Sequence, residues 1–123
     1  MARRILIVDN HEDSTEALRI LFEMHGHEVD TATTGEAGIA RAATGNPDVV
    51  ILDLGLPDID GEVVATAMKS DGRRPFIVAY SGYHLRRPAA LAAGCDAFLL
   101  KPSLAPLIAL VGAAFEQQQR RTC

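Results

Sequence analysis

The sequence has few cysteines, no long apolar run and no excess of positive charge, and each absence excludes a class of protein. Its two cysteines, Cys95 and Cys123, neither make a disulfide framework nor match a paired metal-ligand spacing. The longest apolar stretch, residues 104–115, contains Pro106 and Gly112 and is too short to cross a bilayer. Twelve Lys and Arg residues against sixteen Asp and Glu residues give a net charge of −4, which would repel a phosphate backbone. We therefore expect neither a membrane span nor direct nucleic-acid binding.

The composition is that of an ordinary globular protein. Hydrophobic residues make up 48% of the 123 residues and charged residues 23%, which rules out general disorder. The length fits one compact domain. The first residues lead into apolar sequence without the layout of a secretory signal peptide. We therefore expect residues 1–123 to form a single domain in the cytoplasm.

Short apolar runs alternate with helical patterns along the whole chain. The runs at residues 5–8, 49–52, 76–80 and 97–100 predict strands that are buried on both faces, and the alternating residues 28–32 favour an edge strand. The segments between them predict helices over residues 12–24, 35–43, 60–70, 88–93 and 103–119. This alternation predicts an α/β fold, in which a parallel sheet is covered by helices on both faces.

Polar side chains follow several of the predicted strands at the point where each strand ends. Asp9 and Asn10 follow the first strand, Asp53 the third, Ser81 the fourth and Lys101 the fifth. Alone, such an Asp can be a turn residue and such a Lys a surface charge. Together they converge, because the carboxyl ends of parallel strands lie at the same edge of the sheet. Ligands of such sheets bind beyond this edge. Oxygen ligands suit a hard divalent cation, and an ammonium and a hydroxyl suit a phosphoryl group.

Four motifs in this order resemble the receiver domain of two-component response regulators, the CheY-like family. The motifs are residues 5–10, 50–61, 79–82 and 94–102, and the resemblance runs from about residue 4 to about residue 112. It implies a flavodoxin-like three-layer sandwich with five parallel strands in the order 2-1-3-4-5 and five helices.

The resemblance also implies a role for individual residues. Asp53 would be the phosphoacceptor, which takes a phosphoryl group from a histidine kinase, a phosphotransfer protein or a small phosphodonor. Lys101 would pair with the phosphoryl oxygens and Ser81 would hydrogen-bond one of them. Phe98 occupies the position of the switch aromatic. The output would be a contact with an unknown downstream protein, so we expect a signalling module and not an enzyme.

Mg²⁺ is the cofactor that the resemblance implies. Its ligands would be the side chains of Asp9, Asn10 and Asp53 and the carbonyl of Gly55. Asn10 departs from the family pattern, because a second Asp usually stands there. An amide oxygen can still coordinate a cation but adds no negative charge, so we expect weaker metal binding.

Two further departures concern the signalling surface. Phe98 has no hydroxyl, so a switch there would have to be steric. The segment between the fourth and fifth strands is short and contains Pro88, so we expect a trimmed fourth helix. Because the fourth helix is expected to be trimmed, the surface that contacts the partner need not be the one usual for the family.

Other functions remain open at this stage. The loss of an acid at Asn10 permits a phosphorylation-independent interaction module, and a receiver excised from a hybrid histidine kinase would have a similar sequence. A haloacid-dehalogenase-type phosphatase would need an acid where Gly55 stands. A flavodoxin would bind phosphate after its first strand, where Asp9, Glu12 and Asp13 would repel it.

The four histidines show no metal-ligand spacing among themselves. We expect His25 and His27, which flank a helix-ending glycine, to be exposed. His84 follows the fourth strand and lies within possible reach of the site. Cys95 is expected to be a small buried side chain.

Overall fold

The computed structural model describes residues 3–70 and 75–122, and the strands in this part of the chain form one parallel sheet. They are β1 (Arg4–Val8), β2 (Glu28–Ala32), β3 (Val49–Leu52), β4 (Phe76–Ser81) and β5 (Ala97–Leu100). Their order is β2-β1-β3-β4-β5, and every neighbouring pair is parallel. The expected strand order and the edge position of β2 are confirmed.

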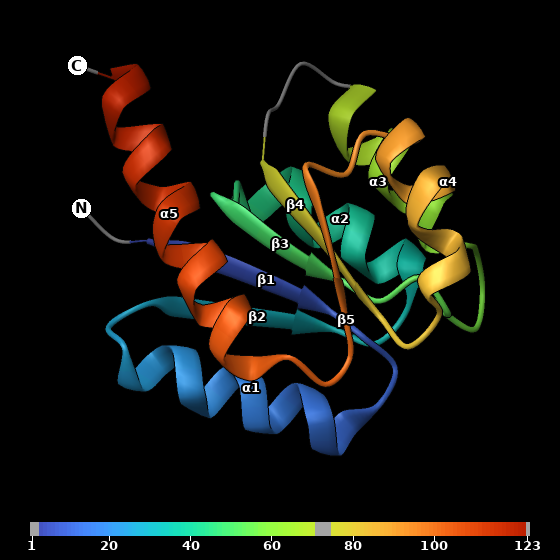
Figure 1. Cartoon of the computed structure of the whole chain (residues 1–123), viewed down its shortest axis with the longest axis horizontal. Coiled ribbons are helices and arrows are strands. Elements are labelled where there is room, and N and C mark those ends of the chain that lie inside the picture. Colours follow the sequence, from blue (N-terminus) through green and yellow to red (C-terminus); the bar gives the residue numbers. More distant parts are fainter. Residues whose placement is uncertain (1–2, 71–74, 123) are drawn as a thin grey trace.

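Helices connect the strands and cover both faces of the sheet (Figure 1). They are α1 (Glu12–Met24), α2 (Gly35–Gly45), α3 (Gly61–Ser70), α4 (Arg87–Ala92) and α5 (Leu104–Thr122), with a 3-10 turn, η1 (His84–Arg86), before α4. Side chains of α1 and α5 pack on one face, and those of α2, α3 and α4 on the other. The predicted three-layer sandwich is therefore present, and α4 is short, with 6 residues.

The continuous apolar runs arise because each strand feeds two cores. Successive residues of a strand point to opposite faces of the sheet. In β1, Ile5 and Ile7 pack with α1 and α5, whereas Leu6 and Val8 pack with α2 and α3. All four side chains are almost completely buried. In a strand that is covered on both faces, polar residues are therefore expected only after the strand has ended.

Most predicted boundaries lie within one residue of the observed ones, whereas the predicted ends of α2 and α5 fall short by two and three residues. β4 continues through Ser81, because this residue still pairs with Leu100 of β5. Ser81 is therefore the last residue of the strand and not the first residue after it. α5 begins at Leu104, and the hydroxyl of Ser103 donates to the carbonyl of Leu100 at 2.6 Å.

Gly61 lets α3 begin in direct contact with the segment after β3. A Cβ at this position would lie 2.6 Å from the Cα of Leu54 and 2.8 Å from the carbonyl oxygen of Asp53. The N–H of Gly61 donates to the Leu54 carbonyl at 3.1 Å. The glycine therefore fixes the loop that carries Asp53 against the start of α3.

The same loop is also tied to α2. Thr34 caps this helix by accepting the N–H of Ala37 at 3.1 Å. The carboxylate of Asp58 accepts the N–H of Gly35 at 2.8 Å and that of Glu36 at 2.9 Å. The bonds from Glu36 and Gly35 lower the pKa of Asp58, because they favour its charged form. The β3–α3 loop is thus held at both of its ends.

His27 is partly buried, so the expectation that it is exposed is wrong. Its ring stacks on Phe115 of α5 at a centroid distance of 4.9 Å and lies 6.0 Å from the ring of Phe22 in α1. His25, by contrast, is exposed as expected. No local pattern predicts the contact, because α5 is far from His27 in sequence and folds back over it.

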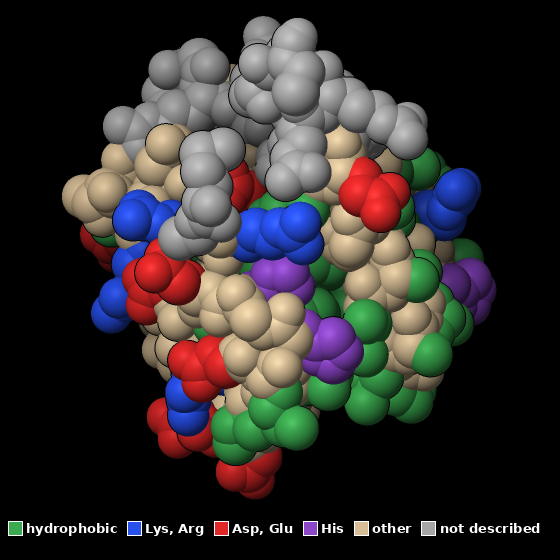
Figure 2. Space-filling model, turned by 90° about the vertical axis from the view of Figure 1, so that its left-hand side faces the viewer, with side chains coloured by type: hydrophobic (Ala, Val, Ile, Leu, Met, Phe, Trp, Pro, Cys, Tyr) green, Lys and Arg blue, Asp and Glu red, His purple; other side chains and the backbone are tan. Residues whose placement is uncertain are grey.

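The end of the molecule where the strands begin carries charges of both signs. In Figure 2, which faces this end, Lys and Arg side chains and Asp and Glu side chains are scattered among histidine and hydrophobic side chains over the described surface. The buried acidic residues described below lie at the opposite end of the strands. Within residues 3–70 and 75–122, no helix has both the length and the apolar character needed to span a membrane.

Candidate functional site

Two buried aspartates lie side by side at the carboxyl end of the sheet. Asp9 follows β1 and Asp53 follows β3, and these neighbouring strands pair with Val8 opposite Leu52. The N–H of Asp53 donates to the Val8 carbonyl at 2.8 Å, which continues the ladder by one residue. Asp9 is 3% exposed and Asp53 6% exposed. The topology therefore buries two acids next to each other, as the sequence predicts.

Lys101 follows the edge strand β5, and its side chain reaches both carboxylates. Its Nζ lies 2.8 Å from Oδ2 of Asp9 and 3.8 Å from Oδ2 of Asp53. The ammonium also lies 5.6 Å from the ring centroid of Tyr80, within the range of a cation–π contact. One positive charge therefore faces two negative charges, and the predicted convergence of these three side chains is confirmed.

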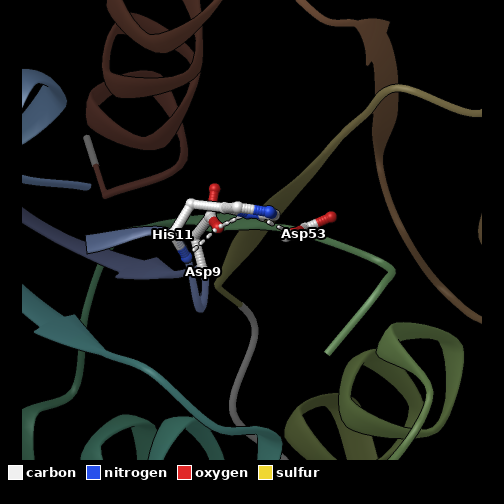
Figure 3. Close-up of side chains that lie close together, drawn as sticks. All are labelled: Asp9, His11 and Asp53. Carbon is white, nitrogen blue, oxygen red and sulfur yellow. Dashed lines mark hydrogen bonds and ion pairs between the residues drawn. The ribbon is translucent and has the colours of Figure 1, made fainter. Parts of the chain in front are cut away.

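His11 is a member of the cluster that the sequence analysis missed. Its Nδ1 lies 2.9 Å from Oδ1 of Asp9 and 3.7 Å from Oδ2 of Asp53 (Figure 3). Comparing the histidines only with one another could not reveal this contact. The useful signal is that His11 stands two residues after Asp9, in the loop where β1 leaves the sheet.

The contacts around Asp9 keep it ionised. Burial alone would raise its pKa, but the hydrogen bonds from Lys101 and from the backbone and ring of His11 outweigh burial and lower the pKa. The His11 N–H donates to Oδ1 of Asp9 at 2.9 Å. A buried carboxylate that is charged and accepts several hydrogen bonds is suited to hold a cation.

The other predicted site residues lie at the same edge with different surroundings. The N–H of Gly55 donates to Oδ1 of Asp53 at 3.1 Å, and Asn10 is exposed beside Asp9. Ser81 is fully buried, and its hydroxyl accepts the N–H of Tyr83 at 3.1 Å.

Phe98 contacts the core and not the carboxylates. It lies in β5 opposite Ala79 of β4 and is partly buried against the cluster that includes Ala90 and Cys95. Cys95 is buried as expected, and burial raises the pKa of its thiol to about 11. The ring therefore sits between the sheet and α4.

The β4–α4 loop is tied to α3 by an ion pair that the sequence analysis did not predict. Arg86 of η1 donates to both carboxylate oxygens of Glu62, at 2.6 Å and 3.1 Å. This hydrogen bonding is the main cause that raises the pKa of Arg86, and the negative charge of Asp53 adds a smaller effect. His84 lines an open pocket together with Gly55.

The donor set at this edge fits a divalent cation. One ligand atom from each of Asp9, His11 and Asp53 can be chosen so that all three lie within 4.8 Å of one another. Carboxylate and carbonyl oxygens are the preferred ligands of Mg²⁺. The cluster can therefore bind a cation and, through Lys101, attract an anionic group beside it.

Comparison with known proteins agrees with this geometry. The sequence profile of the "Response regulator receiver domain" family matches residues 5–111. The transcriptional regulatory protein KdpE of Mycobacterium tuberculosis is 38% identical over 99 residues, which cover 80% of this chain and 44% of that protein. The transcriptional regulatory protein PrrA of Mycobacterium bovis is 35% identical over 118 residues, covering 94% of this chain and 51% of PrrA. The chain spans about half the length of these relatives.

Solved structures give the same result. A CheY-like response regulator receiver domain protein from Methanospirillum hungatei JF-1 aligns with a TM-score of 0.88 at 25% identity, covering 98% of this chain and 99% of that one. The response regulator TrrA from Thermotoga maritima, in complex with Mg²⁺-BeF, aligns with a TM-score of 0.85 at 29% identity, covering 91% and 98%. With the sheet order, the buried acids and the lysine in place, this chain belongs to the response regulator receiver domain family.

Proposed function

We propose that Asp53 accepts a phosphoryl group from a phosphohistidine of a histidine kinase or a phosphotransfer protein. The observation that carries this proposal is a buried carboxylate with one oxygen, Oδ1, held by the N–H of Gly55 and the other facing Lys101 at 3.8 Å. The nucleophile is thus oriented by one backbone donor, and a fixed positive charge lies where phosphoryl oxygens would arrive.

The chemistry follows from these positions. A carboxylate oxygen of Asp53 attacks phosphorus in line, and a P–O bond forms as the P–N bond breaks and the imidazole leaves with its electron pair. Lys101 neutralises negative charge on the transferred group. Ser81 supplies a hydroxyl for one phosphoryl oxygen once it gives up its bond to Tyr83. The protein accepts one phosphoryl group in a single transfer. We therefore do not propose that it turns over a substrate as an enzyme does.

Mg²⁺ is the metal proposed for this site. Asp9, Asn10, Asp53 and the carbonyl of Gly55 would hold it. When bound, it would supply further positive charge beside the phosphoryl group. Asn10 brings one negative charge fewer than an Asp would, so the affinity for Mg²⁺ should rise in an Asn10→Asp variant.

The proposed output is a contact with a downstream protein. The relatives named as transcriptional regulators are about twice as long as this chain, so we propose no DNA contact for residues 1–123. We treat these residues as one receiver unit that changes its surface when Asp53 is phosphorylated.

A phosphorylation assay tests the assignment of Asp53. The protein is incubated with a small acyl phosphate and Mg²⁺, and intact masses are compared for the wild type, Asp53→Asn and the control Asp13→Asn, which alters an exposed acid of α1. We expect one phosphoryl group on the wild type and the control and none on Asp53→Asn. Equal incorporation in all three proteins would refute the assignment.

The same assay separates the second candidate function, an interaction module that needs no phosphorylation. The observation that favours this candidate is Asn10 in place of an acid. A wild type that stays unmodified with Mg²⁺ while Asn10→Asp becomes phosphorylated would support it.

A further inference from the structure

The backbone of His11 is held by several hydrogen bonds, whereas its ring is largely exposed and has one hydrogen bond, to Oδ1 of Asp9. The carbonyl of His11 accepts the N–H of Thr15 at 2.9 Å and its hydroxyl at 2.9 Å. The N–H of His11 donates to Asp9. His11 precedes α1 at the N-cap position, but its side chain makes no capping hydrogen bond. The ring is 64% exposed and can therefore adjust its position over the two buried acids.

Lys101 and His11 contact different oxygens of Asp9 and share Oδ2 of Asp53. Oδ2 of Asp9 is paired with the lysine at 2.8 Å, whereas Oδ1 of Asp9 faces Nδ1 of His11 at 2.9 Å. Oδ2 of Asp53 lies 3.7 Å from the same nitrogen. A metal on the His11 side can therefore take Oδ1 of Asp9 and Oδ2 of Asp53 without breaking the contact of Lys101 with Oδ2 of Asp9.

The distances from His11 to the two acids are close to the spacing of ligands around a single cation. Two ligands that are each about 2.1 Å from a metal lie roughly 3.0–3.4 Å apart at octahedral or tetrahedral angles. The two distances from Nδ1, 2.9 Å and 3.7 Å, lie just outside each end of this range. A small rotation of an exposed ring is enough to close the difference.

We propose that His11 is a metal ligand of this site and shifts its preference toward a borderline cation such as Zn²⁺, relative to Mg²⁺. Neutral imidazole is a good ligand for Zn²⁺, whereas Mg²⁺ prefers carboxylate, carbonyl and water oxygens. Two carboxylates and one imidazole, as in the cluster of Asp9, His11 and Asp53, resemble a zinc donor set. This inference deepens the proposed function, because it concerns the same acidic pocket.

Calorimetric titration of the full chain with ZnCl₂ and with MgCl₂ tests the proposal. The variants are His11→Gln and, as a matched control, His25→Gln, which alters an exposed histidine bonded to the Leu21 carbonyl. We expect His11→Gln to lower the Zn²⁺ affinity by about tenfold or more and the Mg²⁺ affinity by less than about threefold. The control should bind both cations as the wild type does.

Nitrogen NMR of the imidazole rings gives a direct readout that needs no phosphorylation. In the wild type, one equivalent of Zn²⁺ should shift the ring nitrogens of His11 before those of the other histidines. Equal Zn²⁺ affinities in the wild type and His11→Gln, or ring shifts at another histidine first, would overturn the proposal. Failure of Asp53 to accept phosphate would instead overturn the proposed function and would leave the zinc result unaffected.

Discussion

At the scale of single residues, the ammonium of Lys101 is what allows two buried carboxylates to stand next to each other. It lies 2.8 Å from Asp9 and 3.8 Å from Asp53. Without it, the two acids repel each other in a poorly solvated place, and the pKa of Asp9 should rise. We expect Lys101→Met to lower the free energy of unfolding at neutral pH by about 1–3 kcal/mol in the absence of divalent metal, measured by urea titration.

The other lysine of the chain provides the control. Lys69 pairs with Asp96 at 2.9 Å, but both side chains are more accessible to water than the two acids at the site. Lys69→Met should therefore cost less stability than Lys101→Met. Equal losses in the two variants would contradict the view that Lys101 compensates a buried pair.

His27 should make the stability of the protein depend on pH. Burial first, and then the positive charges of Arg3 and His25, lower its pKa below the ordinary value of 6.5. Its buried Nδ1 has no hydrogen-bond partner among the described residues. The unfolded chain therefore binds a proton at a higher pH than the folded chain does. This contribution to stability is complete above about pH 6.5 and is lost as the pH falls toward the folded pKa.

Melting temperatures of the wild type and His27→Phe, compared near pH 7.5 and pH 5.5, measure this effect. The phenyl ring keeps the stacking on Phe115 and cannot take up a proton, so the variant should lose less stability on acidification. His84→Gln, which alters an exposed histidine that does not act on His27, should behave as the wild type does. A wild type and a His27→Phe variant with the same dependence on pH would refute the role of His27.

At the scale of elements, the start of α3 leaves no room for a side chain at Gly61, where the helix meets the loop that carries Asp53. Gly61→Ala would place a Cβ 2.6 Å from the Cα of Leu54, and this contact is with the backbone and cannot be relieved by rotating a side chain. We expect a loss of about 1–3 kcal/mol in a denaturant titration. Gly112→Ala is the control, since nothing lies within 4 Å of its Cβ, and it should leave stability unchanged or raise it. A neutral Gly61→Ala would show that α3 can move away from the loop.

The elements and the convergence at the site follow from local sequence patterns, whereas the contacts between distant side chains do not. Apolar runs and strand order bring Asp9, Asp53 and Lys101 together, because all parallel strands end at one edge. The position of a ring such as that of His11 depends on rotation about its side-chain bonds, which no periodicity encodes. The cap that Asp58 places on α2 and the stacking of His27 on α5 join segments far apart in the chain. Tertiary packing decides such contacts.

At the scale of the whole molecule, the sheet separates two helical layers, and ion pairs tie α3 to the β4–α4 loop and to the start of β5. Arg86 links the β4–α4 loop to Glu62 of α3, and Lys69 of α3 pairs with Asp96 just before β5. Ser81 and Lys101 are adjacent across β4 and β5, because the Lys101 N–H donates to the Ser81 carbonyl at 2.8 Å. A movement of Ser81 can therefore be transmitted directly to the end of β5 through this hydrogen bond.

We expect the surface around β5 to change when the acceptor site at Asp53 is occupied. Beryllofluoride bound at Asp53 mimics a phosphoryl group and should draw Ser81 away from the N–H of Tyr83. Phe98, partly buried against the core cluster on this face of the sheet, should then turn into the space that the hydroxyl leaves. A complete shift between two ring positions needs about 5 kcal/mol of differential affinity, and Phe98 has no hydroxyl to add a hydrogen bond in either position. We therefore expect a partial shift.

Backbone NMR of the protein with and without beryllofluoride and Mg²⁺ measures that shift. Signals should move at Phe98, in α4 and at the start of α5, and intermediate positions or doubled signals should mark the two populations. Asp53→Asn under the same conditions should show no such changes, because the adduct needs the carboxylate. Changes confined to the loops after β1, β3 and β4 would mean that the acceptor site is not coupled to this face. In that case any downstream protein would have to recognise the loops around Asp53 themselves.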